Sequence, residues 1–135
     1  AGSSHVANYL FDPDLRGGDD VIGGVLASGL YVLRKEEMRP NVAQYYGNDD
    51  ALYAQRSAMT HVPKSKVPVF LAVAEMDPVY LITPTFEMAR ALSLRDKKPP
   101  HILRIAHHNH FSTMCTFGTV DDSFSTPLTE WIRSL

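Results

Sequence analysis

The chain has 135 residues, the length of one ordinary domain, and its 44% content of apolar residues is enough for a hydrophobic core. The formal net charge is −2 and no basic run exceeds two residues, so nucleic acid and anionic membrane surfaces are excluded as expected partners. The apolar runs are too short for a membrane span. A single cysteine excludes an internal disulfide and leaves the cellular compartment undecided.

The N-terminal part of the chain predicts one helix, one strand and an irregular region. We expect a helix over residues 1–10, one side of which is formed by His5, Val6, Tyr9 and Leu10. The segment 21–27 is apolar and predicts a short strand that ends at Ser28-Gly29. Residues 34–61 are rich in Tyr, Asn and Asp, which indicates an excursion over one end of a sheet. This excursion either caps a substrate pocket or packs its own aromatic residues at the surface.

The C-terminal part predicts two further strands, each followed by a helix. The segment 67–74 is apolar without interruption, which is typical of a strand buried on both faces of a parallel sheet. Thr83-Pro84 predicts a helix N-cap followed by proline at the first helical position. A third strand is expected at 101–106. The last helix has an apolar face formed by Phe124, Leu128, Trp131, Ile132 and Leu135.

The alternation of strands and helices predicts an α/β fold, with about three parallel strands flanked by helices. We assign residues 1–135 to one domain, with 34–61 as the excursion. Three strands alone leave an apolar sheet edge that invites pairing with another chain segment. We therefore expect the chain to be the C-terminal portion of a larger domain whose N-terminal half is its partner.

Three histidines lie close together in the sequence His107-His108-Asn109-His110. Alternate residues of an extended segment share a face, so His108 and His110 are candidates for a shared metal. A zinc site needs three protein ligands as a rule, and the chain has neither a CxxC pair nor an HExxH motif. A metal is therefore not expected, although a site on His108 and His110 stays open as an alternative. Cys115 is interpreted as a small hydrophobic residue rather than a nucleophile.

An acid and a histidine follow two neighbouring predicted strands. Asp77 comes just after the strand at 67–74, and His110 comes a few residues after the strand at 101–106. The carboxyl edge of an open α/β sheet is where ligands and catalytic groups gather. Asp before Pro is also common in ordinary turns, so a purely structural Asp77 stays open as an alternative. An acid and a histidine on neighbouring strand exits indicate something more specific, since a carboxylate can accept the imidazole Nδ1–H and hold its tautomer. Glu75 is the alternative candidate for the acid that pairs with the histidine.

Five stretches of the chain together resemble one enzyme family. They are Ala1-Gly2-Ser3-Ser4-His5-Val6-Ala7, Ser28-Gly29-Leu30-Tyr31, Tyr45-Tyr46-Gly47-Asn48-Asp49, Ala74-Glu75-Met76-Asp77-Pro78 and His108-Asn109-His110-Phe111-Ser112. With the order of its acid and its histidine, the chain resembles the C-terminal half of an α/β-hydrolase of the esterase/lipase kind. The small carboxylesterases and kynurenine-formamidase-like enzymes are the members that it resembles in particular.

The resemblance implies a serine hydrolase that cleaves a small carboxylic ester or amide without a cofactor. Asp77 matches the acid of the Ser-His-Asp triad and His110 its general base. Ala1 and Gly2 match the last two letters of the Gly-x-Ser-x-Gly motif, so the nucleophile is expected immediately before Ala1 and the Ala1 backbone N–H in the oxyanion hole. Leu30 and Tyr31 are the expected substrate-pocket residues.

One residue departs from the family pattern, since His107 stands where such enzymes often have glycine. The family's upstream His-Gly-Gly motif, which supplies the other oxyanion donors, is not in these 135 residues. Two alternatives from other classes remain. In the first, the chain is a non-catalytic α/β module, or one half of a pseudo-enzyme, that binds a partner chain. In the second, it holds a metal on His108 and His110.

Overall fold

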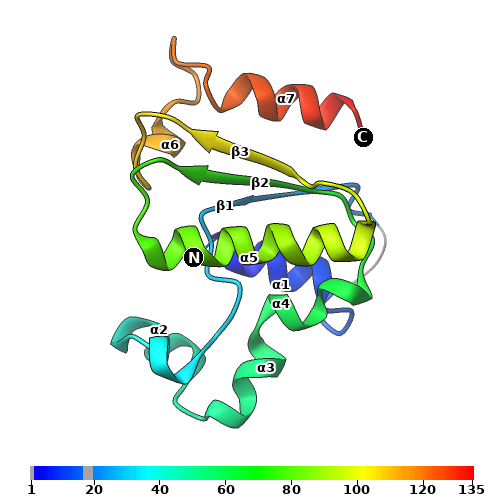
Figure 1. Ribbon diagram of the computed structural model, residues 1–135, viewed down its shortest axis with the longest axis vertical. Helices are drawn as coiled ribbons and strands as arrows, with labels where there is room; N and C mark the ends of the chain where they lie inside the picture. The colour runs from blue at the N-terminus through cyan, green and yellow to red at the C-terminus, as the bar shows by residue number, and fades with distance from the viewer. Residues whose placement is uncertain (1, 17–19) are drawn as a thin grey trace.

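The computed structural model describes residues 2–16 and 20–135. Within these ranges, three parallel strands form a sheet in the order β1-β2-β3 (Figure 1). They are β1 (Gly24–Ala27), β2 (Val69–Ala74) and β3 (His101–Ile105). The α/β class and the three-stranded parallel sheet expected from the sequence are thereby confirmed. β1 starts three residues later than predicted because its only described pairing partner is β2, whose first residue Val69 lies opposite Gly24.

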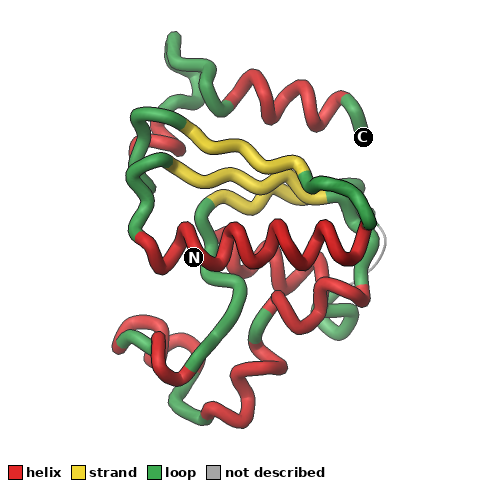
Figure 2. Tube along the Cα trace, viewed as in Figure 1, coloured by secondary structure: helices red, strands yellow, loops and turns green. Residues whose placement is uncertain are grey.

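Helices cover both faces of the sheet (Figures 1 and 2). On one face, α1 (Gly2–Phe11) and α5 (Val79–Asp96) bury Ala7 and Met88 against Leu71 of β2. On the other face, α7 (Ser125–Arg133) buries Trp131 against Phe70. Every residue of β2 is buried, which explains why its sequence is apolar without alternation.

Two helices differ from their predicted form. α5 begins at Val79, so Pro78 takes the N-cap position and Pro84 lies inside the helix. Thr83 is therefore not a cap, and its hydroxyl donates to the carbonyl of Val79. In α1 only Leu10 of the predicted side is buried, while His5, Val6 and Tyr9 are exposed. The buried side also includes Ser4 and Ala7, because these small residues let the helix approach β1 closely.

The excursion at 34–61 extends below α5 and away from the sheet (Figure 2). It contains the helices α2 (Pro40–Tyr46), α3 (Tyr53–Arg56) and α4 (Ala58–His61), with 3₁₀ turns η1 (Lys35–Glu37) and η2 (Asp50–Leu52). It is followed by η3 (Val62–Lys64), while the short helix α6 (Ser112–Cys115) follows β3. None of the helices described here combines the length and hydropathy that crossing a membrane requires.

Candidate active site

Asp77 lies in the turn between β2 and α5, at the carboxyl edge of the sheet. This turn is fastened to the loop after β3, because the backbone N–H of Met76 donates to the carbonyl of His108 (2.9 Å). Asp77 is held in turn by the N–H of Ala74, which donates to its Oδ2 (2.7 Å). The Asp77 side chain is 0% exposed, so its carboxylate depends on protein donors for its hydrogen bonds.

His110 lies in a loop that Asn109 and Ser112 hold in one conformation. The side-chain Oδ1 of Asn109 accepts from the N–H groups of Phe111 (2.9 Å) and Ser112 (3.0 Å). The hydroxyl of Ser112 accepts from the N–H of Asn109 (2.9 Å). These reciprocal bonds on both sides of His110 fix its backbone, and they are typical of Asn and Ser in turns.

The loop brings His110 against Asp77. Nδ1 of His110 lies 3.1 Å from Oδ1 of Asp77, although the two residues are 33 positions apart in the chain. A carboxylate only accepts hydrogen bonds, so this contact places the proton of the neutral imidazole on Nδ1. Nε2 has no hydrogen-bond partner among the described residues, and the side chain is 39% exposed. The imidazole is therefore oriented to take up a proton at Nε2.

Ser28 is a third member of this group. The sequence identified Ser28 as the end of a strand but not as a residue of the site. Its hydroxyl donates to Oδ2 of Asp77. Its φ angle is +48°, a left-handed conformation that costs a non-glycine residue about 1–2 kcal/mol. A serine at the exit of the strand beside the one that carries the acid is the sequence signal that would have identified it.

A pocket of about 310 Å³ opens beside His110. Its lining includes Leu30, Val42 and Tyr46 together with Tyr80 at the start of α5. It is thus formed by the carboxyl edge of the sheet and by the excursion, whose α2 supplies Val42 and Tyr46. Polar side chains such as Arg39 and Asn41 share the lining with the apolar ones. A volume near 300 Å³ with such a mixed lining suits a small organic ligand.

Tyr31, expected beside Leu30 in the pocket, lies instead in the core. It is 1% exposed, and its phenolic oxygen accepts from the N–H of Gly29 (3.0 Å). A side chain at Gly29 would overlap the Tyr31 ring, so the glycine is what allows this close approach. Burial raises the pKa of Tyr31 well above its ordinary value. Tyr31 thus supports the loop from below, and Leu30 alone of the pair reaches the pocket.

The backbone N–H of Ala1, expected as a donor of the oxyanion hole, lies outside the described residues. The first turn of α1, which follows it, contacts the exit of β1. The Ser3 hydroxyl donates to the carbonyl of Ala27 (2.6 Å), and the Ser4 hydroxyl accepts from the N–H of Leu30 (3.1 Å). Ser4 also lines the pocket beside His110. The N-terminal end of α1 therefore lies at this edge of the sheet.

His108 does not share a site with His110. Its Nε2 lies 2.9 Å from Oδ2 of Asp121, and its Nδ1 lies 3.1 Å from the hydroxyl of Ser112. Both ring nitrogens are thus engaged by protein groups. Hydrogen bonds from Ser123, together with the nearby His108 ring, lower the pKa of Asp121. In the described ranges no three His, Cys, Asp or Glu side chains gather as metal ligands would, which counts against the metal alternative.

The remaining candidate residues, Glu75, His107 and Cys115, do not contact the Asp77–His110 pair through any described hydrogen bond. Glu75 accepts from the backbone N–H of His107 (2.7 Å) and pairs with Arg104 (2.7 Å). The bond from His107 and the charge of Arg104 lower the pKa of Glu75, which therefore stays ionised and supports the loop. His107 is 94% exposed and has a φ of +63°, so it occupies a conformation that favours glycine. Cys115, which the sequence suggested as a small buried hydrophobic residue, is instead exposed in α6, and it forms no hydrogen bond with His110 in the described structure.

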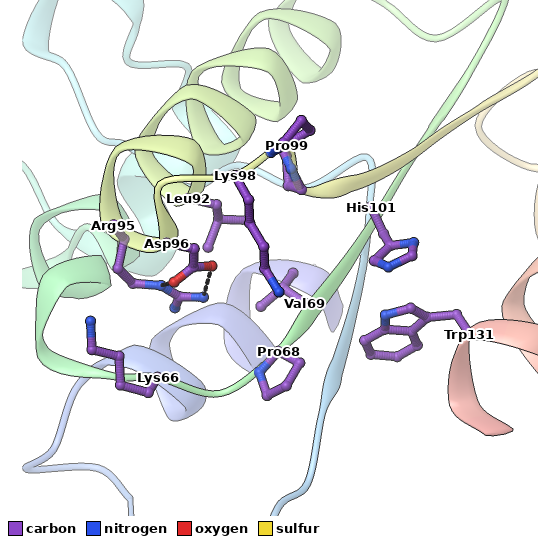
Figure 3. Close-up of a pocket in the computed structure, with 11 residues that line it drawn as sticks. Lys66, Pro68, Val69, Leu92, Arg95, Asp96, Lys98, Pro99, His101 and Trp131 are labelled. Carbon is purple, nitrogen blue, oxygen red and sulfur yellow. Dashed lines mark hydrogen bonds and ion pairs between the residues drawn. The ribbon is translucent and has the colours of Figure 1, made fainter. Parts of the chain in front are cut away.

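A second pocket, of about 440 Å³, lies at the opposite, amino edge of the sheet (Figure 3). Arg95 and Asp96 form an ion pair there (2.7 Å), and Trp131 faces His101. The Arg95 guanidinium also donates to the carbonyl of Val67 (3.2 Å) and is almost fully buried. Arg95 thus connects the end of α5 to the residues just before β2. Neither Asp77 nor His110 lines this pocket, so it is separate from their group.

Comparison of the sequence with known protein families and with curated proteins gave no match. The site is consequently interpreted from its own geometry. That geometry consists of a buried carboxylate, a histidine oriented by it, and a pocket onto which the histidine opens.

Proposed function

We propose that this chain carries the acid and the base of a serine hydrolase of the α/β-hydrolase type, which cleaves a small carboxylic ester or amide. One observation carries the proposal. Asp77 Oδ1 and His110 Nδ1 are 3.1 Å apart on neighbouring strand exits, while Nε2 is left without a described partner beside a pocket. A histidine held in this way is the general base that activates a hydroxyl nucleophile.

The nucleophile in this proposal is a serine immediately before Ala1. Its hydroxyl attacks the substrate carbonyl while Nε2 of His110 takes up its proton, and Asp77 stabilises the imidazolium. His110 then returns the proton to the leaving alcohol or amine as the carbon–heteroatom bond breaks. Water, deprotonated by the same nitrogen, attacks the acyl-enzyme. The imidazolium then returns this proton to the serine oxygen as the acyl C–O bond breaks, which releases the acid and the free serine.

The position of α1 supports this assignment. Ser4, in its first turn, lines the same pocket as His110, so the start of the helix and the histidine lie at one pocket. In the α/β-hydrolase motif the nucleophile stands just ahead of such a helix, and the N–H of the next residue stabilises the oxyanion. Ala1 takes that role in the proposal, together with donors from an N-terminal half.

The unpaired edge of β1 in the described structure supports the expected partner. In the described ranges β1 pairs with β2 alone, which leaves its other edge without a neighbouring strand. We propose that a strand of the N-terminal half of the same domain pairs there, because apolar sheet edges are covered in stable proteins.

The pocket supports a small substrate. Leu30 and Val42 provide apolar contact for an acyl chain. Tyr46 and Tyr80 also line the pocket, and the Arg39 guanidinium lies over the Tyr80 ring (3.2 Å). In the proposed reaction His110 carries out every proton transfer, so the reaction requires no metal or organic cofactor.

The test compares two histidines of the same loop in the protein that includes the residues before Ala1. His110→Asn is expected to lower kcat/KM for p-nitrophenyl acetate by about 10³-fold or more, since the base is lost. His107→Asn is the matched control, because Asn tolerates its left-handed backbone and its exposed ring does not line the pocket. Hydrolysis by the His110→Asn protein at the rate of the control would refute the proposal.

A further inference from the structure

The two oxygens of the Asp77 carboxylate have different tasks. Oδ2 accepts two hydrogen bonds, one from the Ser28 hydroxyl and one from the N–H of Ala74 (2.7 Å). Oδ1 accepts from His110 Nδ1 (3.1 Å). Because the Asp77 side chain is fully buried, its rotation would break the bonds at Oδ2. The two donors at Oδ2 thus determine where Oδ1 points.

Ser28 is itself held rigidly. Its N–H donates to the carbonyl of Ala72 (3.0 Å), which extends the pairing of β1 with β2 by one residue. On the preceding residue, both the N–H and the carbonyl of Ala27 bond the Ser3 hydroxyl of α1 (3.0 and 2.6 Å). The Ser28 hydroxyl is therefore delivered to Asp77 from a fixed backbone.

The backbone of Ser28 is in a conformation that glycine adopts more readily, with φ at +48°. The side chain is nevertheless a serine, buried, and its hydroxyl bonds the acid. An unfavourable backbone conformation at such a position points to a role for the side chain that compensates for it.

We propose that Ser28 is a positioning residue for the Asp77–His110 pair. Its hydroxyl locks the carboxylate so that Oδ1 faces Nδ1 of His110 and keeps the imidazole proton on Nδ1. The three strand exits then act in series, with Ser28 after β1 orienting Asp77 after β2, and Asp77 orienting His110 after β3. The consequence for catalysis rests on the proposed function, whereas the orientation of the imidazole does not.

The orientation is tested in this chain by NMR of the histidine ring, without any substrate. Selective ¹⁵N labelling of histidine reports which ring nitrogen of His110 carries the proton at a pH where the ring is neutral. Ser28→Ala removes the hydroxyl and keeps the backbone constraint, while Ser28→Gly removes the hydroxyl and relieves the constraint. Both variants are expected to lose the strong preference of His110 for the proton on Nδ1.

Comparison of the two variants separates positioning from a structural role. Relief of the backbone conformation should make the Gly variant the more stable to urea, yet it should not restore the Nδ1 preference. Retention of that preference in both variants, or its recovery in Ser28→Gly alone, would overturn the proposal.

Activity supplies a second readout in the protein that includes the residues before Ala1. Both variants are expected to lower kcat for p-nitrophenyl acetate by about 10- to 100-fold, the range that misplacement of a catalytic group produces, with little change in KM. An unchanged kcat in both would also overturn the positioning role. If the wild-type protein does not hydrolyse the ester, the proposed function fails, and the NMR result still decides whether Ser28 orients His110.

Discussion

Replacing Asp77 by Asn is the sharpest perturbation of the site, since it removes one charge and keeps the shape of the side chain. The amide oxygen of Asn can accept the two bonds that now end on Oδ2, from Ser28 and Ala74. Its NH₂ group then faces Nδ1 of His110, where the carboxylate oxygen was. A donor in that place requires Nδ1 to accept, so the ring proton moves to Nε2 and the base is lost.

The magnitudes follow from these three contacts. A hydrogen bond to a charged group contributes about 1.5–3 kcal/mol and a neutral one about 0.5–1.5 kcal/mol, so two bonds weaken by about 1 kcal/mol each. Burying a neutral amide is less costly than burying a carboxylate, which offsets part of this loss. The expected destabilisation is therefore about 1–2 kcal/mol, and the protein remains folded. The wrong tautomer is expected to lower kcat by about 10⁴-fold.

Two measurements check the Asp77→Asn prediction. Urea unfolding gives the change in stability, and ¹⁵N NMR of the His110 ring gives the tautomer. The wild-type ring is expected to carry its proton on Nδ1 and the variant ring on Nε2. If the variant keeps the proton on Nδ1, Asp77 does not control the tautomer and the reasoning fails.

Three further predictions concern the framework of the site. His107→Gly is expected to raise stability to urea by up to about 1 kcal/mol, because relief of the left-handed backbone exceeds the added freedom of the unfolded chain; a loss would contradict this. Trp131→Ala is expected to destabilise by about 3–5 kcal/mol in the same assay, since the ring is buried against Phe70; a loss below about 1 kcal/mol would show that α7 packs otherwise. The pKa of Glu75 is lowered in the folded state, so its stabilising effect is full above its ordinary pKa of 4.5 and is lost as the pH falls through the folded value. The stability difference between wild type and Glu75→Gln, measured by urea unfolding across this range, should thus shrink with acid, and a constant difference would contradict the account.

The strands were predictable because their burial is recorded in their composition. β2 is apolar throughout, and the structure buries it on both faces. The start of α5 was not predictable in the same way. Thr83-Pro84 has the local sequence pattern of a helix start. The Val79-Tyr80 pair, where the helix actually begins, has no such pattern. Local propensity indicated a boundary that tertiary packing moved upstream by five residues.

The site was predictable as far as the topology of the sheet determined it. Asp77 and His110 follow adjacent parallel strands, and adjacent strand exits meet at one edge, so their approach was expected from the sequence. Tyr31 was misplaced because the sequence does not reveal that the chain turns its ring inward beneath Gly29. The sequence indicated that Ser28 lies at the same edge of the sheet, but its bond to Asp77 was not predictable, since that bond depends on the register between β1 and β2.

The central claim is that His110 activates a serine immediately before Ala1. The most direct measurement is intact-protein and peptide mass spectrometry after reaction with a fluorophosphonate, on the protein that includes the preceding residues. The account predicts one phosphonyl group, located on that serine, and its loss in the His110→Asn protein. Absence of any label, or equal labelling with and without the imidazole, would contradict it.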